Sequence, residues 1–326
     1  MKAIVQPRFG SPDVLQFVDT DQPAIGPDDV LVRVYAAALN PYDWHIMRGD
    51  PYVARLMGAV GLTRPKPRIA GVDGAGVVEA VGAKVRELRP GEEVLGRFEG
   101  AFAEYARAEA NLVVRKPGRL TFEQAAGVPM AGQTALRAIR DAGQVRAGQR
   151  VLVNGAAGGV GSFAVQIAAA LGAEVTGVCS TGNVETVRSI GAAHVVDYTK
   201  DDFTDGHVRY DVVQDNVGNQ PLRRLRRALT PTGTLVSNAG GSPDGRVFGP
   251  IGAIIRVLAV NGFVKQRLRP LPDTWTREHL LAVVDLVEAG QVTPVVGRSY
   301  PLADTAAGMR YLEQGHARGK VVVTVR

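Results

Sequence analysis

The stretch Arg150–Leu171, RVLVNGAAGGVGSFAVQIAAAL, decides the fold of this 326-residue chain. An apolar run that fits a buried strand leads into a turn crowded with glycines, and an Ala-rich run that fits a helix follows. Such a strand, turn and helix form a mononucleotide-binding unit, because backbone without side chains lets a pyrophosphate approach the helix N-terminus. Gly158 and Gly161 match the second and third glycines of G-x-G-x-x-G, whereas Ala156 stands at the first.

This variant turn leaves other ligands open. Enzymes that use S-adenosylmethionine and plain glycine-rich turns share the pattern, whereas a Walker-type phosphate loop is excluded because no Lys-Ser or Lys-Thr pair follows the glycines. The end of the next strand favours NADPH over NADH. A fold that prefers NADH has Asp or Glu there, but this chain has Ser180, with Thr181 and Asn183 just after. These neutral side chains would admit a 2′-phosphate, and they also fit simple helix capping.

Strands and helices alternate through the second half of the chain, which indicates an α/β fold with a doubly wound parallel sheet. Residues 1 to about 117 consist of short apolar runs separated by Gly and Pro turns, which is typical of a β-rich domain. We expect the closing strand, KVVVTV, to rejoin that domain. The predicted strands after the turn are 174–179, 194–196, 211–214 and 234–237, and the predicted helices are 159–171, 184–190, 222–229, 277–288 and 305–313.

Composition indicates a soluble, cytoplasmic protein of two domains. Hydrophobic residues make up 45% of the chain, yet there is no 18-residue apolar run for a membrane span. The N-terminus does not fit a signal peptide, and Cys179 has no partner for an intrachain disulfide. The net charge of +6 raises the question of nucleic acid. The densest basic cluster, Arg223–Arg227, lacks interleaved aromatic residues and fits a solvated helix face better.

Six stretches in a fixed order carry a family resemblance: ALNPYDW (38–44), IAGVDGAGVVEAVG (69–82), RPGEEVLG (89–96), AGQTAL (131–136), GAAGGVG (155–161) and DNVG (215–218). The chain resembles the medium-chain dehydrogenase/reductase superfamily, in its zinc-independent quinone oxidoreductase and enoyl reductase branch. The resemblance implies a Rossmann NAD(P)-binding domain, residues 122–268, inserted in a GroES-like substrate domain, residues 1–121 and 269–326. It also places the nicotinamide in the cleft between them.

The residues at the family's metal positions predict that no zinc is bound. Zinc-dependent members bind the ion with a Cys where this chain has Asn40 and with a His-Glu pair where it has Val72 and Asp73. Neither Asn nor Val is a plausible zinc ligand, and a single cysteine cannot form a four-Cys structural site.

Without a metal to stabilise an alkoxide, the acceptor must already be activated. We therefore expect hydride transfer from NADPH to a quinone or an α,β-unsaturated carbonyl, whose anion needs only hydrogen-bond donors and a proton. Two alternatives stay open: a carbonyl reductase of the same fold that acts on ketones or aldehydes, and a non-catalytic protein that binds NADPH or associates with RNA.

The resemblance brings Asn40 and Asp43 beside the nicotinamide, with His45 and Tyr52 on the segment that forms its wall. Asn40 would present its amide to the substrate carbonyl, or it only shapes the turn before Pro41. His45 would relay a proton, or it is a packing histidine. Tyr52 fits less well, because the family's tyrosine has a different spacing from Gly49.

Further positions are expected to line the cofactor, most of them at the carboxyl ends of parallel strands. Backbone amides of the glycine turn would bind the pyrophosphate, and Tyr198 is carried over as a neighbour of the 2′-phosphate. We also expect a homodimer formed near Asn261–Gln266, through an exposed last strand of the Rossmann sheet. The complete set of expected cofactor contacts is Thr134, Gly158, Gly159, Val160, Gly161, Ser180, Thr181, Asn183, Tyr198, Asn216, Gly218, Asn238, Ala239 and Gly240.

Overall fold

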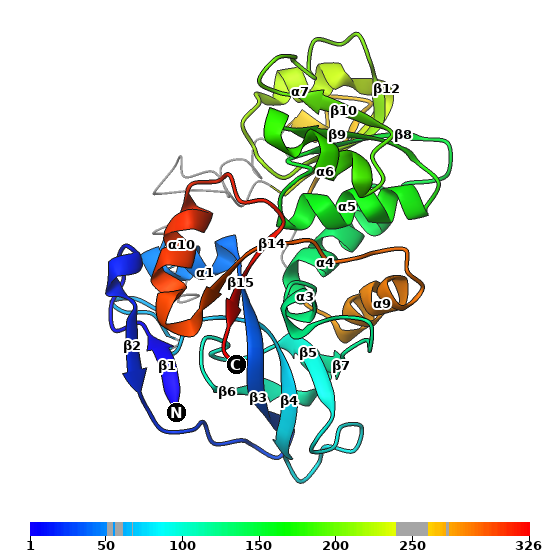
Figure 1. Ribbon diagram of the computed structural model, residues 1–326. Coiled ribbons are helices and arrows are strands. Elements are labelled where there is room, and N and C mark those ends of the chain that lie inside the picture. The colour runs from blue at the N-terminus through cyan, green and yellow to red at the C-terminus, as the bar shows by residue number, and fades with distance from the viewer. Residues whose placement is uncertain (51–54, 56–60, 67, 239–259, 272–273) are drawn as a thin grey trace. The chain divides into compact units, whose positions relative to one another are not determined.

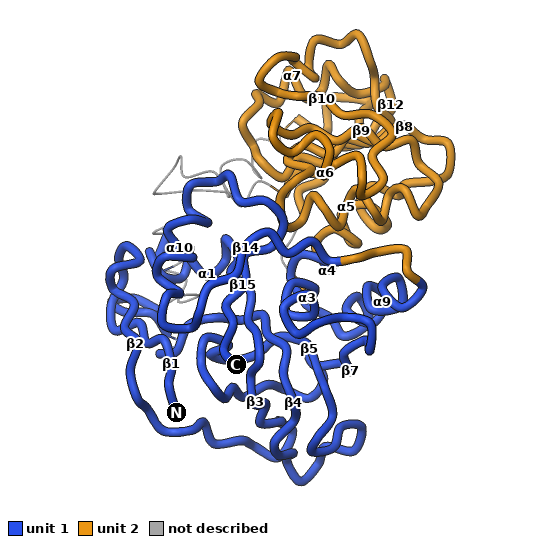
Figure 2. The backbone as a smooth tube through the Cα atoms, viewed as in Figure 1, with its two compact units in different colours: residues 1–133, 275–289, 294–326 blue, residues 134–274, 290–293 orange. Residues whose placement is uncertain are grey.

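The computed structural model describes residues 1–50, 55, 61–66, 68–238, 260–271 and 274–326 (Figure 1). The chain divides into two compact units. Unit 1 comprises Met1–Gln133, Trp275–Ala289 and Pro294–Arg326, and unit 2 comprises Thr134–Thr274 and Gly290–Thr293 (Figure 2). No helix among the described residues is long and apolar enough to cross a membrane.

Unit 1 is built on a seven-stranded sheet in the order β14-β15-β3-β4-β5-β7, with β6 paired to β3. The closing strand β15 pairs antiparallel with β3, with Val321 opposite Leu39, so the prediction that it rejoins the β-rich domain is confirmed. The strands are β3 (Asp29–Leu39), β4 (Asp73–Val81), β5 (Glu93–Arg97), β6 (Tyr105–Glu109), β7 (Val113–Arg115), β14 (Val296–Pro301) and β15 (Lys320–Thr324), and β1 (Lys2–Val5) forms a separate pair with β2 (Gln16–Asp19).

Every second side chain at the start of β3 packs into the core of unit 1, which stabilises this sheet. Val30, Val32 and Val34 are fully buried and pack in one core cluster with Phe98 and Phe102. The helices in the described part of this unit are α1 (Pro41–Arg48), α3 (Phe122–Ala126), α4 (Pro129–Leu136), which starts in unit 1 and ends in unit 2, α9 (Arg277–Glu288) and α10 (Thr305–Glu313).

The start of α3 shows how local sequence sets a helix boundary. The Oγ1 of Thr121 accepts a hydrogen bond from the Gln124 amide at 3.2 Å, and the Gln124 Oε1 accepts one from the Thr121 amide at 3.1 Å. This reciprocal pair satisfies two backbone donors that the first turn leaves free. Thr121 is therefore the N-cap of α3.

Unit 2 contains a six-stranded parallel sheet in the order β10-β9-β8-β11-β12-β13, as predicted from the alternation of strands and helices. The predicted bounds in this unit agree with the structure to within one residue, except for the start of one strand. The strand expected at 234–237 begins at Leu229, and the helix before it ends at Ala228. The strands are β8 (Arg150–Asn154), β9 (Glu174–Cys179), β10 (His194–Asp197), β11 (Tyr210–Asp215), β12 (Leu229–Ser237) and β13 (Arg267–Pro270), and the helices are α5 (Gly159–Ala170), α6 (Val184–Ser189) and α7 (Leu222–Ala228).

The end strand of this sheet lies slightly later in the chain than the dimer prediction placed it. It is β13, whose residues follow Asn261–Gln266 directly. Within the described residues β13 pairs only with β12, so its other edge has no strand beside it. The homodimer itself stays a prediction.

Candidate active site and cofactor site

The glycine turn joins β8 to α5 and has the geometry that a phosphate group requires. Gly155 has a φ of +76°, which favours glycine, and its carbonyl accepts a hydrogen bond from the Gly158 amide at 3.1 Å. A Cβ at Gly161 would lie 2.1 Å from the Gly155 carbonyl oxygen, so only glycine fits there. Gly158 is the extended residue just before the helix.

The turn leaves the first amides of α5 available to a ligand. Gly159, Val160 and Gly161 are the first three residues of this 12-residue helix, and backbone amides at such positions have no partner within a helix. They are the positive end of the helix dipole, where phosphate binds readily. A dinucleotide pyrophosphate therefore fits this turn.

Polar side chains join the carboxyl ends of three neighbouring strands. Asn154 at the end of β8 donates to the Asp215 carboxylate at 2.8 Å, and Asp215 also accepts hydrogen bonds from the amides of Val217 and Gly218. Asn216 donates to the Asn154 carbonyl at 3.1 Å. Asn238 donates to the Asn216 side chain at 3.4 Å. This network fixes the loops in which Asn216, Gly218 and Asn238 were predicted to border the cofactor.

A second polar group lies where β9 and β10 end. Asp197 is buried and accepts hydrogen bonds from the hydroxyls of Thr181 at 2.6 Å and Thr199 at 2.7 Å. The Thr181 bond is the largest of the hydrogen bonds that lower the Asp197 pKa to about 2, so the carboxylate is ionised at neutral pH. The ammonium of Lys200 lies 3.6 Å from the same carboxylate, and Tyr198 is exposed beside it.

Capping does not explain the polar residues that follow β9. Neither Ser180 nor Asn183 makes a side-chain capping bond, although each stands at the N-cap of a short helix. Instead the Asn183 amide donates to the Ser180 hydroxyl at 3.0 Å. The capping alternative is therefore wrong for these two residues. Their role toward the 2′-phosphate stays a prediction.

Unit 1 contains a buried polar cluster, which we call the Asn40 cluster: Asn40, Asp43, Asp73 and Lys320. Each residue is at most 5% exposed. Asn40 follows the last residue of β3 and precedes α1. The Asp43 carboxylate accepts a hydrogen bond from the Asn40 backbone amide at 2.8 Å. The Asn40 side-chain amide donates to Asp73 at 3.1 Å and to the Ala38 carbonyl at 3.3 Å.

The Asp73 carboxylate has a second partner at the start of α4. Its Oδ2 accepts a hydrogen bond from the Met130 amide at 3.1 Å, which satisfies a donor in the first turn of that helix. Its Oδ1 is buried and has no hydrogen-bond partner in the part of the chain that the structure describes. Burial raises the pKa of Asp73 to about 6, against the opposing charge of Lys320.

Asp43 is a second buried carboxyl group of the cluster, and it holds its proton more tightly than an ordinary aspartate. Burial raises its pKa to about 7, and the neighbouring Asp73 charge adds to the increase. The hydrogen bond from the Asn40 amide and the charge of Lys320 oppose it. A carboxyl group of this kind exchanges a proton at neutral pH, which an ordinary surface aspartate does not.

The orientation of Asn40 bears on its predicted role. Its side-chain amide already donates to Asp73 and Ala38, so a bond to a substrate carbonyl would replace one of these.

His45 stacks on Trp44 with ring centroids 3.8 Å apart, and its Nδ1 lies 3.1 Å from the Asp50 carbonyl oxygen. Because a carbonyl only accepts, this nitrogen carries the hydrogen. Tyr52, Ala239 and Gly240 lie outside the described residues, and Thr134 is half-buried in α4.

Sequence reasoning missed Lys320, Asn154 and Asp197. Lys320 is separated from Asn40 by 280 positions, and only the pairing of β15 with β3 brings them together. A lysine that opens an otherwise apolar strand, KVVVTV, was the available signal.

Among the residues described, no three His, Cys, Asp or Glu side chains gather as metal ligands. Burial raises the pKa of the Cys179 thiol to about 11.

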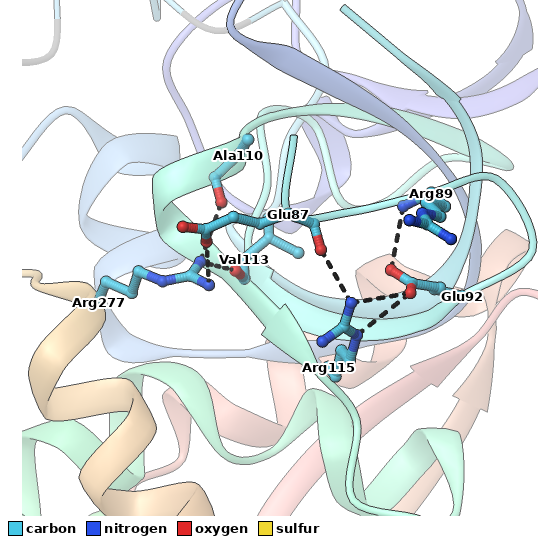
Figure 3. Close-up of polar contacts among 7 residues, drawn as sticks. All are labelled: Glu87, Arg89, Glu92, Ala110, Val113, Arg115 and Arg277. Carbon is cyan, nitrogen blue, oxygen red and sulfur yellow. Dashed lines mark hydrogen bonds and ion pairs between the residues drawn. The ribbon is translucent and has the colours of Figure 1, made fainter. Parts of the chain in front are cut away.

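Another polar group in unit 1 has a structural role. Arg277 at the start of α9 donates to the carbonyls of Ala110 and Val113 and pairs with Glu87 at 2.8 Å (Figure 3). Arg115 pairs with Glu92 at 2.9 Å and donates to the Glu87 carbonyl at 2.9 Å. These contacts attach α9 and the segment before β5 to β7, and they involve none of the predicted site residues.

Comparison with known proteins agrees with this architecture. Residues 26–118 match the alcohol dehydrogenase GroES-like domain family, and residues 190–323 match the zinc-binding dehydrogenase family. The chain is 36% identical to the NADPH-dependent alkenal/one oxidoreductase of Arabidopsis thaliana chloroplasts and 34% identical to the 2-methylene-furan-3-one reductase of Solanum lycopersicum. Each alignment covers 99% of this chain and 79% of the relative.

A solved structure gives the same result. The quinone oxidoreductase from Coxiella burnetii is 31% identical and superposes with a TM-score of 0.86, over 100% of this chain and 99% of that one. The predicted fold class, a GroES-like domain with a Rossmann-type sheet, is confirmed. The chain therefore belongs to the medium-chain dehydrogenase/reductase superfamily, in its branch of quinone oxidoreductases and enoyl reductases.

Proposed function

We propose that this protein is an NADPH-dependent reductase that transfers hydride to an α,β-unsaturated carbonyl compound or a quinone. The glycine turn at the N-terminus of α5 is the observation that carries the proposal, because a Cβ at Gly161 would collide with the Gly155 carbonyl. The names of the relatives support the same reaction, since they act on alkenals, a methylene-furanone and quinones.

The residues proposed to contact the cofactor lie at the carboxyl ends of the strands in unit 2. The amides of Gly159, Val160 and Gly161 bind the pyrophosphate, and the Asn154–Asp215 network holds the loops beside the riboses. NADPH is the preferred form because neutral Ser180 and Thr181 stand where NAD-binding folds have a carboxylate. Lys200 supplies the cation for the 2′-phosphate, although the ionised Asp197 close to it weakens the attraction.

NADPH, when bound, would supply a hydride to the substrate. The enolate or hydroquinone anion formed from the substrate must then be protonated. Asp43 holds a proton near neutral pH and is the proton donor, directly or through water. Asn40 is its neighbour on the same segment, and its side-chain amide orients the substrate oxygen by exchanging its bond to the Ala38 carbonyl for one to the substrate. His45 is retained as a proton relay on the same helix. Tyr52, which lies outside the described residues, is retained as a substrate contact.

The reaction proceeds without zinc. Asn40 and Val72 stand at two positions where zinc-dependent relatives have ligands, and the Asn40 side chain is engaged with Asp73 instead. We further propose that the protein is cytoplasmic, takes a small-molecule substrate and forms a homodimer along β13. Nucleic acid is a less favoured partner.

Mixing the protein with NADPH under anaerobic conditions tests the function. A panel of alkyl enones, quinones, ketones and aldehydes serves as acceptors, and the absorbance of the reduced nicotinamide is followed. We expect it to decay with enones or quinones and not with simple ketones. Decay only with ketones or aldehydes would favour a carbonyl reductase. Tight NADPH binding without decay for any acceptor would favour the non-catalytic alternative.

A further inference from the structure

The position of Lys320 in the fold is unusual for a lysine. It is the first residue of β15, one step before Val321, which pairs with Leu39, and it is 3% exposed. Its carbon stem lies close to the end of α3, because a Cβ added at Gly127, the residue after α3, would lie 3.1 Å from the Lys320 Cγ. Burying an ammonium group is costly unless acceptors surround it, so its contacts need an explanation.

The hydrogen-bond partners of the Lys320 ammonium group are Leu39, the last residue of β3, and Asn40, which follows it. The ammonium group donates to the Asn40 Oδ1 at 2.5 Å and to the Leu39 carbonyl at 3.3 Å. The carboxyl groups of Asp73 and Asp43 act on it only through their charges, which oppose the lowering of its pKa by burial. The charged groups that act on the cluster are therefore these three and Arg97, which lies opposite Asp73 on β5.

The bond from Lys320 decides which way the Asn40 amide points. Because an ammonium group only donates, the atom that faces it must be the amide oxygen. The Asn40 nitrogen is then directed to Asp73 and Ala38, which are both acceptors. The backbone amide of the same residue donates to Asp43. One lysine thus connects β15, the end of β3 and the first turn of α1.

We propose that Lys320 is a positioning residue of the active site, whose buried ammonium group fixes the Asn40 side chain and the segment that carries Asp43. The proposal rests on the function given above, because it assigns the positioned segment to the substrate. Lys320 touches no substrate itself. Its charge also stabilises the ionised forms of Asp73 and Asp43, and so opposes the effect of burial on the pKa of both carboxyl groups.

Two variants separate the hydrogen bond from the charge. Lys320→Met removes both, whereas Lys320→Gln keeps a donor and removes only the charge. Lys116→Met is the matched control. Lys116 is another buried lysine of unit 1, with a side chain 5% exposed, and its ammonium donates to the Leu120 carbonyl at 2.6 Å and pairs with Glu93 at 3.0 Å. It does not contact the Asn40 cluster.

Backbone amide hydrogen exchange measures the positioning without any substrate. We expect Lys320→Met to increase exchange over residues 39–47 by about 10-fold or more, and Lys116→Met to leave this segment unchanged. The exchange rate of Lys320→Gln over these residues should lie between those of wild type and Lys320→Met. If Lys320→Met exchanges like wild type over residues 39–47, the proposal is overturned, whether or not the protein reduces any acceptor.

Kinetics supply the second readout. In Lys320→Met we expect kcat to fall about 10-fold or more while the KM for NADPH changes less than about 2-fold. In Lys320→Gln, loss of the positive charge should move the alkaline limb of the kcat profile up by about one pH unit. A wild-type pH profile in both variants would overturn the proposal. Absence of turnover in the wild-type enzyme would instead overturn the proposed function, and hydrogen exchange would still decide the role of Lys320.

Discussion

The side-chain amide of Asn40 donates a hydrogen bond to the carboxylate of Asp73 at 3.1 Å, with both residues almost completely buried. The family resemblance predicts that these two positions correspond to ligand positions of the zinc-dependent members. Here they are bonded to each other, and Asn40 is bonded to Lys320 as well. A network of hydrogen bonds and charges thus joins Asn40, Asp73 and Lys320, and burial raises the pKa of the neighbouring Asp43 carboxyl group to about 7.

Replacing Asp43 tests its role as the proton donor. Asp43→Asn preserves the size of the side chain but removes the exchangeable proton, so we expect kcat to fall by about 100-fold or more. In the wild-type enzyme kcat should decrease as the pH rises through about 7, because the carboxyl group loses its proton. Stopped-flow measurements over a pH series check both expectations. A kcat in Asp43→Asn close to the wild-type value would exclude Asp43 as donor.

The same carboxyl group should make stability depend on pH. Its folded pKa of about 7 lies above the ordinary value of 3.8, so the folded state binds this proton more tightly than the unfolded state. The resulting stabilisation is complete below about pH 4 and is lost as the pH rises toward 7, by an amount on the order of 1–4 kcal/mol. Urea unfolding between these limits should show a smaller decline in Asp43→Asn. Equal declines in both proteins would contradict the shift.

Gly161→Ala tests the glycine turn. The added Cβ would lie 2.1 Å from the Gly155 carbonyl oxygen, so the turn must move and the amides of α5 lose their arrangement. We expect NADPH affinity to fall by about 10-fold or more, measured by isothermal titration calorimetry. Gly118→Ala is the control, because a Cβ there meets no atom within 4 Å. Unchanged affinity in Gly161→Ala would show that the pyrophosphate binds elsewhere.

Lys200→Gln tests recognition of the 2′-phosphate. Removal of an exposed cation near a dianionic group should weaken NADPH binding by about 3- to 10-fold at low salt, with little effect on NADH. Lys84→Gln removes an equally exposed lysine of unit 1, paired with Asp28, and serves as control. An equal loss of affinity for NADPH and NADH in Lys200→Gln would remove Lys200 from the 2′-phosphate site.

Arg277→Met tests the structural group of unit 1. The carbonyls of Ala110 and Val113 would lose a charged donor, at a cost of about 1–3 kcal/mol in the free energy of unfolding. Arg86→Met should cost under about 0.5 kcal/mol, because Arg86 is exposed and donates only to the Ala83 carbonyl. Thermal and urea unfolding provide the comparison. Similar stabilities of the two variants would show that the Arg277 contacts contribute little.

The dimer is tested by sedimentation velocity over a range of concentrations. The open edge of β13 should pair with its symmetry mate, so we expect a species of twice 34.5 kDa. A single 34.5 kDa species throughout that range would contradict the dimer.

Local signals in the sequence predicted much of the fold. Thr121 and Gln124 form the capping pair that their spacing indicates, and the last helix has the predicted bounds, Thr305–Glu313. The start of β12 was missed because Pro231 and Gly233 look like a turn. In the structure Leu229 already pairs with Tyr210, and the register shifts before Thr234. An irregular strand of this kind has no periodic pattern to read.

The candidate site was predictable only in part. The glycine turn is local, so its residues could be read directly from Gly155–Gly161. The Asn40 cluster is assembled from β3, β4 and β15, and its charges act through burial that no sequence window reveals. Asp73 was noted only as the acidic residue left at a metal position, and Lys320 was not noted at all. Asp73 and Lys320 are brought near each other by the register of strands far apart in the chain.

Transfer of deuterium from the cofactor tests the central claim most directly. NADPH that carries deuterium at the reactive nicotinamide carbon is mixed with an enone substrate and the metal-free protein, and the product is analysed by mass spectrometry and NMR. We predict one deuterium per product molecule, on the carbon β to the carbonyl, at a rate that a chelator does not change. A product without deuterium at that carbon, or turnover that requires added zinc, would contradict the account.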